Sequence, residues 1–324
     1  MLKSFASLAA LAVGALAVGP AAAQGNAYPS KLIKIVVPTS PAGGNDAMAR
    51  IIAHKLNQRV KQPVIVENKP GANGAIGTEL VAKSAPDGYT ILFGYIATHG
   101  INPALSKVPY DPVKDFAPIT QVAEAQGVLV VTPTVQAKSV KELIALAKSK
   151  PGKLNYASAG NGTAPHIAGE LFNQLTGTDF LHVPYKGAGP AVTDTLAGNT
   201  QLMFPSLVAA SGHIKSGKLR GLAVTGKKRS ALFPELPTVA ESGVPGFEIV
   251  QWYGLFAPAK TPKDIVDKLN REVVAVLEDP DTVRKFSAQG AEIVTGAPGD
   301  LGKLVQSELA KWGKFIKEAK ISAD

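Results

Sequence analysis

The chain has 324 residues, no cysteine, 18% charged residues and a formal net charge of +9. Without cysteine it has no disulfides, no thiolate nucleophile and no cysteine-based metal site. Its basic charge fits nucleic acid, anionic lipid or an anionic solute, and most of it is expected to be solvated surface. No block of five Lys or Arg occurs, and aromatic residues make up only 6%. We therefore expect no nucleic-acid partner, because such partners need basic blocks or stacking platforms.

The N-terminus has the three-part layout of a secretory signal peptide. Lys3 supplies a positive charge, residues 5–18 carry none, and Ala21-Ala22-Ala23 offers small residues for cleavage. We predict a signal peptide over residues 1–23, cleaved after Ala23, with a competing site after Ala27. Because the apolar run is shorter than the roughly 20 residues that cross a bilayer, we expect an exported protein rather than an anchored one.

Beyond residue 28, apolar strands and amphipathic helices alternate along the chain. Strands are predicted at 32–37, 64–67, 90–93 and 127–131, and helices at 45–60 and 76–83. A further strand-like run covers 249–256. In it, Trp252 and Tyr253 either line a pocket wall or lie in the core, and the core is favoured for Trp252.

Later helices carry recognisable start signals. Ser139 and Glu142 have the spacing of a capping box. A helix that starts at Thr163 and ends at Gly177 places Ile167, Leu171 and Leu175 on one face, and one that starts at Thr261 does the same with Ile265, Leu269 and Val273. This alternation predicts an α/β fold in which helices cover mainly parallel sheets, in two closely joined domains.

Three predicted loops join the end of a strand to the start of a helix, where ligands bind in open α/β sheets. Helix N-termini carry free backbone N–H groups and a partial positive charge, so they hold carboxylates without a cation. The loops are Pro38–Asp46, Ser158–Thr163 and Pro184–Pro190. Their candidate ligand-binding residues are Thr39, Pro41, Ala42, Gly43, Gly44, Asn45, Ser158, Asn161, Gly162, Thr163 and Lys186.

Several polar side chains near these loops leave two roles open. Thr98 and His99 follow a strand as a candidate pocket lip, and His99 either faces the ligand or has a structural role. Lys186 either pairs with a carboxylate or points to water. His166 is expected to fix the first turn of its helix, and Asp46 to neutralise or cap a helix N-terminus.

The common enzyme motifs are missing from the sequence. It has no Gly-Lys-Ser/Thr phosphate loop and no Gly-x-Ser-x-Gly elbow, and Gly71, Gly74 and Gly77 do not match the dinucleotide fingerprint. The five histidines never fall at metal-ligand spacings. We predict that the protein is not an enzyme and has no catalytic residue, metal site or cofactor. An exported hydrolase or transferase acting on a carboxylate is the alternative from another class.

Taken in order, many segments resemble the Bug (Bordetella uptake gene) family, the extracytoplasmic solute receptors of tripartite tricarboxylate transporters. They cover essentially the whole mature chain: Tyr28-Pro29 and residues 41–46, 86–90, 158–166, 183–187, 219–225, 237–243 and 246–247.

The resemblance implies a periplasmic, type II-like Venus-flytrap fold with the ligand in a cleft between two domains. Domain 1 would comprise residues 28–125 and 229–324, and domain 2 residues 126–228. The ligand would be a di- or tricarboxylate or an aromatic acid, held by the loops at Thr39 to Asn45 and Ser158 to Thr163. The implied partners are membrane permease subunits. We expect a monomer, and a sensor that serves a signalling receptor is the alternative within binding proteins.

One position departs from the family pattern. After Leu202-Met203-Phe204 many relatives carry Asp, whereas Pro205 and Ser206 follow here. The missing carboxylate predicts a ligand without an amino group and makes Ser206 a candidate ligand-binding residue. Valine at Gly43 or Gly162 is expected to lower ligand affinity while leaving the fold intact, because each would add bulk where the backbone approaches a carboxylate.

Overall fold

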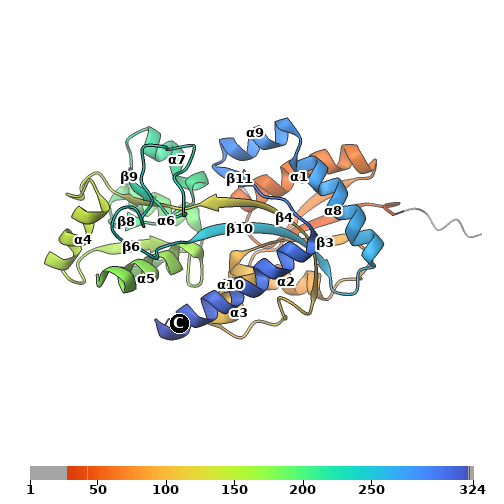
Figure 1. Ribbon diagram of the computed structural model, residues 1–324, viewed down its shortest axis with the longest axis horizontal. Helices are drawn as coiled ribbons and strands as arrows, with labels where there is room; N and C mark the ends of the chain where they lie inside the picture. Colours follow the sequence, from red (N-terminus) through yellow and green to blue (C-terminus); the bar gives the residue numbers. More distant parts are fainter. Residues whose placement is uncertain (1–27, 42, 320, 322–324) are drawn as a thin grey trace, which may run out of the picture.

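The computed structural model describes residues 28–41, 43–319 and 321. The strands form two sheets in two lobes that lie side by side, with β4 (Phe116–Gln126) and β10 (Val250–Pro258) crossing the middle (Figure 1). The predicted signal peptide, both cleavage sites and Ala42 lie outside the described residues. In the described part, no helix is long and apolar enough to cross a membrane.

The first sheet is mixed. Besides β4 and β10 it contains β1 (Ile33–Val37), β2 (Val64–Asn68), β3 (Thr90–Tyr95) and β11 (Ala291–Ile293), in the order β11-β4-β10-β3-β1-β2. β1 pairs in parallel with β2 and β3, whereas β10 pairs antiparallel with β3 and β4. The prediction of mainly parallel sheets is therefore wrong. β4 leaves this sheet towards the other lobe and β10 returns from it, so the two run in opposite directions.

The second sheet is also mixed. It contains β5 (Val128–Val131), β6 (Asn155–Ser158), β7 (Leu181–Pro184), β8 (Leu202–Met203) and β9 (Arg220–Val224), in the order β7-β6-β8-β5-β9. Its helices are α4 (Val140–Ser149), α5 (Ala164–Thr176), α6 (Ala188–Ala197) and α7 (Leu207–Lys215). All strands of this sheet come from residues 128–224. The predicted domain boundaries stay a prediction, because the sheets assign strands and not the loops between them.

The alternation of side chains along β1 explains how the first sheet is covered on both faces. Ile33, Ile35 and Val37 join one hydrophobic cluster with α1 (Gly44–Val60), α8 (Lys263–Leu277) and α9 (Pro280–Ala288). Val36 joins the other cluster, with α2 (Ala75–Ala82), α3 (Asn102–Leu105) and α10 (Pro298–Glu318). This second cluster continues into the other lobe, where it includes Leu129 and Phe172. A continuous core therefore links the lobes.

The chain crosses between the sheets at Gly127 and again between β9 and β10, and Thr225 joins the two crossings. Its hydroxyl donates to Ile249 O (2.7 Å) and accepts from Gly127 N (2.8 Å). Its backbone N–H donates to Gly127 O (3.0 Å), and its carbonyl accepts from Ile249 N (3.0 Å). These four hydrogen bonds hold the crossing segments together at one residue.

Most of the helices and strands predicted from the sequence are present within a few residues. Ser139 caps α4 by accepting from Glu142 N (3.2 Å), and Gly177 ends α5 with a left-handed φ of 61°. Trp252 is buried in the core, as favoured. Leu175 is the main error in the predicted helix faces, because it lies in the last turn of α5 and is 43% exposed.

Candidate ligand site between the lobes

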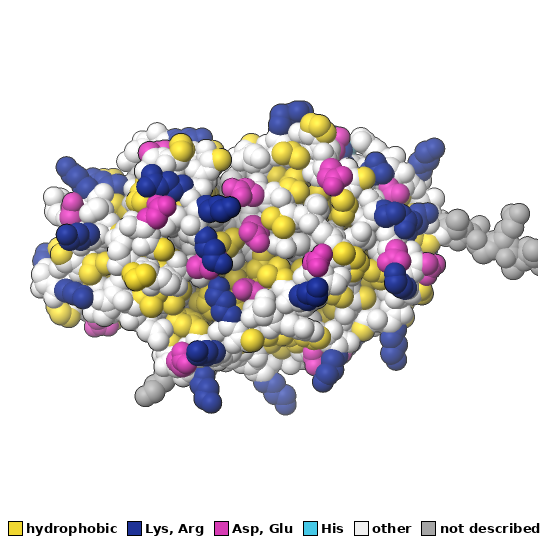
Figure 2. Space-filling model, viewed as in Figure 1, with side chains coloured by type: hydrophobic (Ala, Val, Ile, Leu, Met, Phe, Trp, Pro, Cys, Tyr) yellow, Lys and Arg dark blue, Asp and Glu magenta, His cyan; other side chains and the backbone are white. Residues whose placement is uncertain are grey.

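The positive charge of the protein is not gathered into one patch on the face that Figure 2 shows. Lys and Arg side chains are interspersed there with Asp and Glu over both lobes. A site for an anion must therefore be sought in local geometry rather than in net charge.

The first predicted loop lies between β1 and the first turn of α1. Gly43 is the N-cap of α1 and no side chain caps this helix. Thr39 Oγ1 and Asn45 Nδ2 are buried, and neither has a hydrogen-bond partner among the described residues. Because a buried polar group without a partner is costly, these two atoms and the free amides of α1 are suited to a polar ligand. Pro41 is exposed at the outer edge of the loop.

Asp46 lies in the first turn of α1 and forms an ion pair with Arg50 (2.9 Å). It therefore sits at the helix N-terminus, as expected, and neutralises positive charge there.

The second predicted loop lies between β6 and α5. Its hydroxyls are used inside the loop: Ser158 Oγ accepts from Gly160 N (3.0 Å), and Thr163 Oγ1 donates to Gly160 O (2.7 Å). The sequence suggested that both hydroxyls were open to a ligand, whereas here they shape the loop. Thr163 does not cap α5 with its side chain, so the amides of the first turn are the groups suited to an anion.

His166 and His182 form hydrogen bonds to residues of the second loop. His166 Nδ1 accepts from Gly162 N (3.1 Å), which confirms that His166 fixes this turn. Burial lowers the pKa of His166 to about 4, with a further lowering by His182, and burial lowers the pKa of His182 to about 4. Both rings are therefore neutral at pH 7 and cannot serve as cations for a carboxylate.

The third predicted loop flanks the second. Tyr185 N donates to Ser158 O (3.1 Å), and Gly187 N donates to Ala159 O (3.1 Å). Lys186 is exposed and has no ion-pair partner within the described ranges. Both roles considered for Lys186, pairing with a carboxylate and pointing to water, stay predictions.

Thr98 and His99 are both fully buried in the first lobe. Thr98 Oγ1 is within 3.0 Å of Tyr95 O and 2.9 Å of His99 Nδ1. The His99 ring stacks on Phe256 with centroids 4.1 Å apart, and burial lowers its pKa to about 3. Of the two roles predicted for His99, this position favours the structural one and corrects its placement on a pocket lip. Thr98 is likewise engaged within its own lobe.

Ser206 lies between β8 and α7, and it forms an isolated β-bridge with the crossing residue Gly127. It is the N-cap of α7, and its hydroxyl accepts from Ala209 N (3.3 Å). A Cβ placed on Gly44 would lie 3.7 Å from Val208 Cγ1, so the first turns of α1 and α7 face each other across the lobes. Ser206 is thus near the first loop, although its hydroxyl is engaged in its own helix.

The structure also brings to this site two residues that were missed from the sequence. Asn73 Nδ2, in the first lobe, donates to Asn102 Oδ1 (2.8 Å) and to Asn161 O of the second lobe (3.2 Å). A Cβ on Gly162 would lie 2.9 Å from Leu105 Cδ2 and 3.1 Å from Asn102 Oδ1. The loops of the two lobes therefore touch directly. Asn73 lies between the glycines that were weighed only as a dinucleotide motif, but its loop also joins a strand to a helix, and that position was the available signal.

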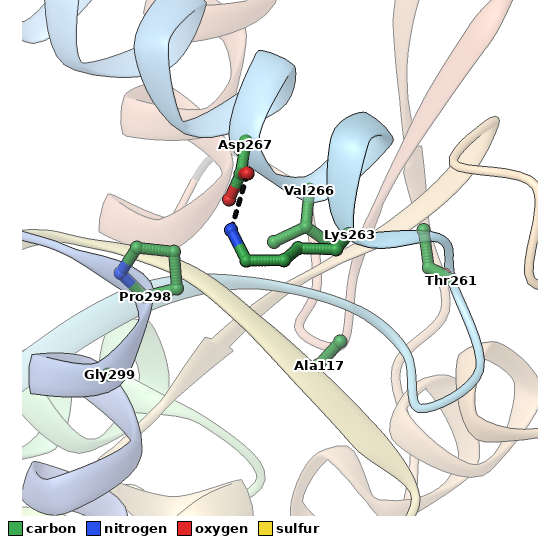
Figure 3. A pocket seen from close by; sticks show the side chains of 7 residues that line it. All are labelled: Ala117, Thr261, Lys263, Val266, Asp267, Pro298 and Gly299. Carbon is green, nitrogen blue, oxygen red and sulfur yellow. Dashed lines mark hydrogen bonds and ion pairs between the residues drawn. The ribbon is translucent and has the colours of Figure 1, made fainter.

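One cavity lies away from this site and another lies at the junction of the lobes. A surface pocket of about 390 Å³ lies against the N-terminal ends of α8 and α10 and contains the Lys263–Asp267 ion pair (2.6 Å), as Figure 3 shows. It lies on the first lobe and contains none of the predicted ligand residues. The second, of about 10 Å³, lies beside Ala164 and the crossing residues Gly127 and Thr225. It has room for about one water.

Comparison with known proteins agrees with this geometry. The family model described as tripartite tricarboxylate transporter family receptor matches residues 48–321. The chain is 38% identical to a UPF0065 protein from the tcbD-tcbE intergenic region of Pseudomonas sp. strain P51, covering 98% of this chain and 95% of that one. It is 37% identical to BugT of Bordetella pertussis, covering 90% of each.

Solved structures show the same fold. Rpa4515 of R. palustris, solved with adipate, has a TM-score of 0.86 and 36% identity, covering 91% of this chain and 99% of that one. MatC of Rhodopseudomonas palustris, solved with malate, has a TM-score of 0.82 and 34% identity, covering 89% and 99%. The periplasmic binding protein BugD has a TM-score of 0.83 and 35% identity, covering 91% and 99%.

Two mixed sheets joined by two crossings, with uncapped helix N-termini at the junction, define a two-lobed periplasmic solute-binding protein of the Venus-flytrap type. The chain belongs to the tripartite tricarboxylate transporter receptor family, to which the Bug proteins also belong. This is a family of solute-binding receptors and not a family of enzymes.

Proposed function

We propose that this protein captures a small organic carboxylate between its lobes and delivers it to the permease subunits of a tripartite tricarboxylate transporter. One observation carries the proposal: α1 and α5 come from different sheets, follow glycine loops, lack side-chain caps and begin where the lobes meet. Free helix N-termini attract carboxylates. The relatives solved with adipate and malate support an acid as the ligand.

The expected ligand contacts follow from polar side chains that lack a hydrogen-bond partner in the described part of the chain and from uncapped backbone amides. Thr39 Oγ1, Asn45 Nδ2 and the amides at Gly43 and Gly44 would hold one end of the acid. The amides that follow Gly162 would hold the other. The two lobes would have to part for entry and close again around the ligand. We propose that they comprise residues 28–125 with 229–324 and residues 126–228.

The ligand class can be narrowed by charge. Pro205 and Ser206 follow β8, and no carboxylate stands there to pair with an ammonium group. We therefore expect simple di- or tricarboxylates or aromatic acids to bind more tightly than aspartate or glutamate. Tighter binding of either amino acid than of every simple acid would contradict this expectation.

A thermal-shift screen of the ligand-stripped protein tests the proposal. The panel contains C4 to C6 dicarboxylates, citrate, acidic amino acids, nicotinate and benzoate-type acids. A true ligand at about a hundred times its Kd adds about 2.7 kcal/mol to the free energy of unfolding, which raises the melting temperature by several degrees. Lys263→Ala, in the distant surface pocket, should leave the shift unchanged. No shift with any acid would overturn carboxylate capture.

Delivery and export need separate tests. Membrane vesicles that contain the permease subunits should take up the identified acid only when this protein is added. Binding without any such uptake would instead favour a sensor. We also propose a monomeric periplasmic protein that is cut after Ala23 or Ala27, and the intact mass and solution mass of the exported chain check both points.

A further inference from the structure

Three stacked rings lie behind the second loop. Tyr156 on β6 stacks on His182 of β7 with centroids 4.9 Å apart and planes at 23°. His182 stacks on His166 of α5 with centroids 4.2 Å apart and planes at 22°. Tyr156 is anchored at its far end, because its hydroxyl donates to Glu170 Oε1 (2.5 Å) on the next turn of α5. The stack therefore joins two strands and a helix beneath residues 158–163.

Each imidazole makes one hydrogen bond to the loop. His182 Nε2 is 2.6 Å from Ser158 Oγ, which in turn accepts from Gly160 N (3.0 Å). His166 Nδ1 accepts from Gly162 N (3.1 Å). The two histidines thus control the directions of the amides of Gly160 and Gly162, one through a serine and one directly.

The loop needs such support because its backbone is unusual. Gly160 and Gly162 have φ values of +121° and +73°, a region in which glycine has many competing conformations. The side chain of Thr163 does not cap α5. Without outside restraint, a loop with two glycines would not hold the first turn of α5 in one orientation.

We propose that His166 and His182 are positioning residues, which hold the Ser158–Thr163 loop in the shape that presents its amides to the ligand carboxylate. The inference rests on the proposed function, because it assigns how that site is kept in order. Neither ring needs to touch the ligand.

The protonation of the rings agrees with this role. An imidazole nitrogen that accepts from an amide must be unprotonated, so His166 carries its proton on Nε2. Burial lowers the pKa of both rings to about 4, which keeps them neutral at pH 7.

Paired substitutions separate hydrogen bonding from packing. His166→Asn and His182→Gln each place a polar atom near the nitrogen that now bonds to the loop, whereas His166→Leu and His182→Leu fill similar space without one. With an acid found in the screen, we expect each Leu variant to bind about tenfold more weakly, which corresponds to one lost hydrogen bond. The Asn and Gln variants should bind within about threefold of the wild type. His54→Leu, at an exposed position on α1, is the matched control and should bind normally.

The outcomes distinguish this inference from the proposed function. If the wild-type protein binds no acid, carboxylate capture itself fails. If it binds an acid and the Leu variants bind equally well, or if the polar variants lose as much affinity as the Leu variants, the positioning role is overturned. Nitrogen NMR of the wild-type histidines needs no variant to fold: a proton on His166 Nδ1 would be incompatible with the bond from Gly162, and would also overturn the proposal.

Discussion

Buried neutral histidines are a recurring feature of this protein at the scale of single residues. His99 lies in an aromatic cluster of the first lobe, and His166 and His182 lie behind a loop of the second. In each case burial is the main cause of the lowered pKa. The anion binding that we propose would therefore depend on backbone amides and helix N-termini rather than on imidazolium groups.

Because these histidines have lowered pKa values, we expect the free energy of unfolding to fall on acidification before the carboxylates titrate. The pKa of His99 is about 3 in the folded protein and about 6.5 when unfolded. Between these values only the unfolded chain binds the proton, so stability is complete above about pH 6.5 and falls as the pH drops. His99 alone should cost about 2 kcal/mol at pH 5. Urea unfolding at pH 7.5 and 5.0 should show a smaller loss for His99→Asn than for the wild type, and equal losses would contradict this cause.

The two glycine substitutions separate ligand contact from backbone strain. Gly43 has an extended backbone (φ −85°), and a Cβ there would meet its nearest neighbour, Ser40 O, at 3.7 Å. Gly43→Val should leave the melting temperature nearly unchanged and weaken acid binding by about tenfold or more.

By contrast, valine at Gly162 should affect both stability and ligand affinity, which corrects the expectation from the sequence that it leaves the fold intact. At φ +73° a side chain is strained by about 1–2 kcal/mol, and the Cβ would clash with Leu105 of the other lobe. Gly162→Val should therefore lower both melting temperature and affinity, as measured by calorimetry. A Gly43→Val protein with normal affinity would move the site away from α1.

At the scale of elements, α10 packs on the first sheet through apolar side chains and through one carboxylate, that of Glu308. Glu308 Oε2 accepts from the indole nitrogens of Trp252 on β10 (3.1 Å) and Trp312 on α10 (2.8 Å). Both indoles are almost fully buried. The carboxylate thus satisfies two buried donors at once and sets the position of the helix under β10.

Removing the Glu308 carboxylate should lower the free energy of unfolding. Glu308→Leu would leave two buried N–H groups without a partner, at about 1–3 kcal/mol each. Glu308→Gln keeps a carbonyl oxygen and should lose much less. Equilibrium unfolding in urea measures both variants, and similar stability of the two would show that the carboxylate does not anchor α10.

At the scale of the whole molecule, groups far apart in the sequence join the two lobes. Thr225 ties the crossing segments at one end of the interface, and Asn73 reaches Asn161 of the second lobe at another. Domain closure of this kind brings the halves of a ligand site together around a hinge.

The contact made by Asn73 predicts an effect on ligand release. Asn73 has φ +50°, so Asn73→Gly suits the backbone while it removes the side-chain bond to the second lobe. We expect release of the acid to be about three- to tenfold faster, as measured by stopped-flow fluorescence. Lys61→Gly, at a similar φ of 54° at the end of α1, is the matched control. An unchanged release rate would show that this contact does not hold the lobes closed.

Much of the local structure was predictable from the sequence. The helix start at Ser139, the stop at Gly177 and the strand in β1 depend on neighbours a few residues away, and these predictions are confirmed. The predicted capping box forms only in part, because the Glu142 carboxylate accepts from Lys138 N (2.8 Å) rather than from the N-cap amide. The three loops at strand ends were also found, because turn residues and helix starts are local signals. The family resemblance is confirmed through the family model and the relatives.

The same sequence did not reveal how these parts meet. The directions of β4 and β10, the burial of His99 against Phe256 and the contact of Asn73 with Asn161 all depend on residues tens to hundreds of positions apart. The sequence by itself determined the helices, the strands and the loops that can hold an anion. Tertiary structure alone decided which of those loops face each other, because long-range packing sets strand direction and side-chain orientation, and local periodicity carries no information about either.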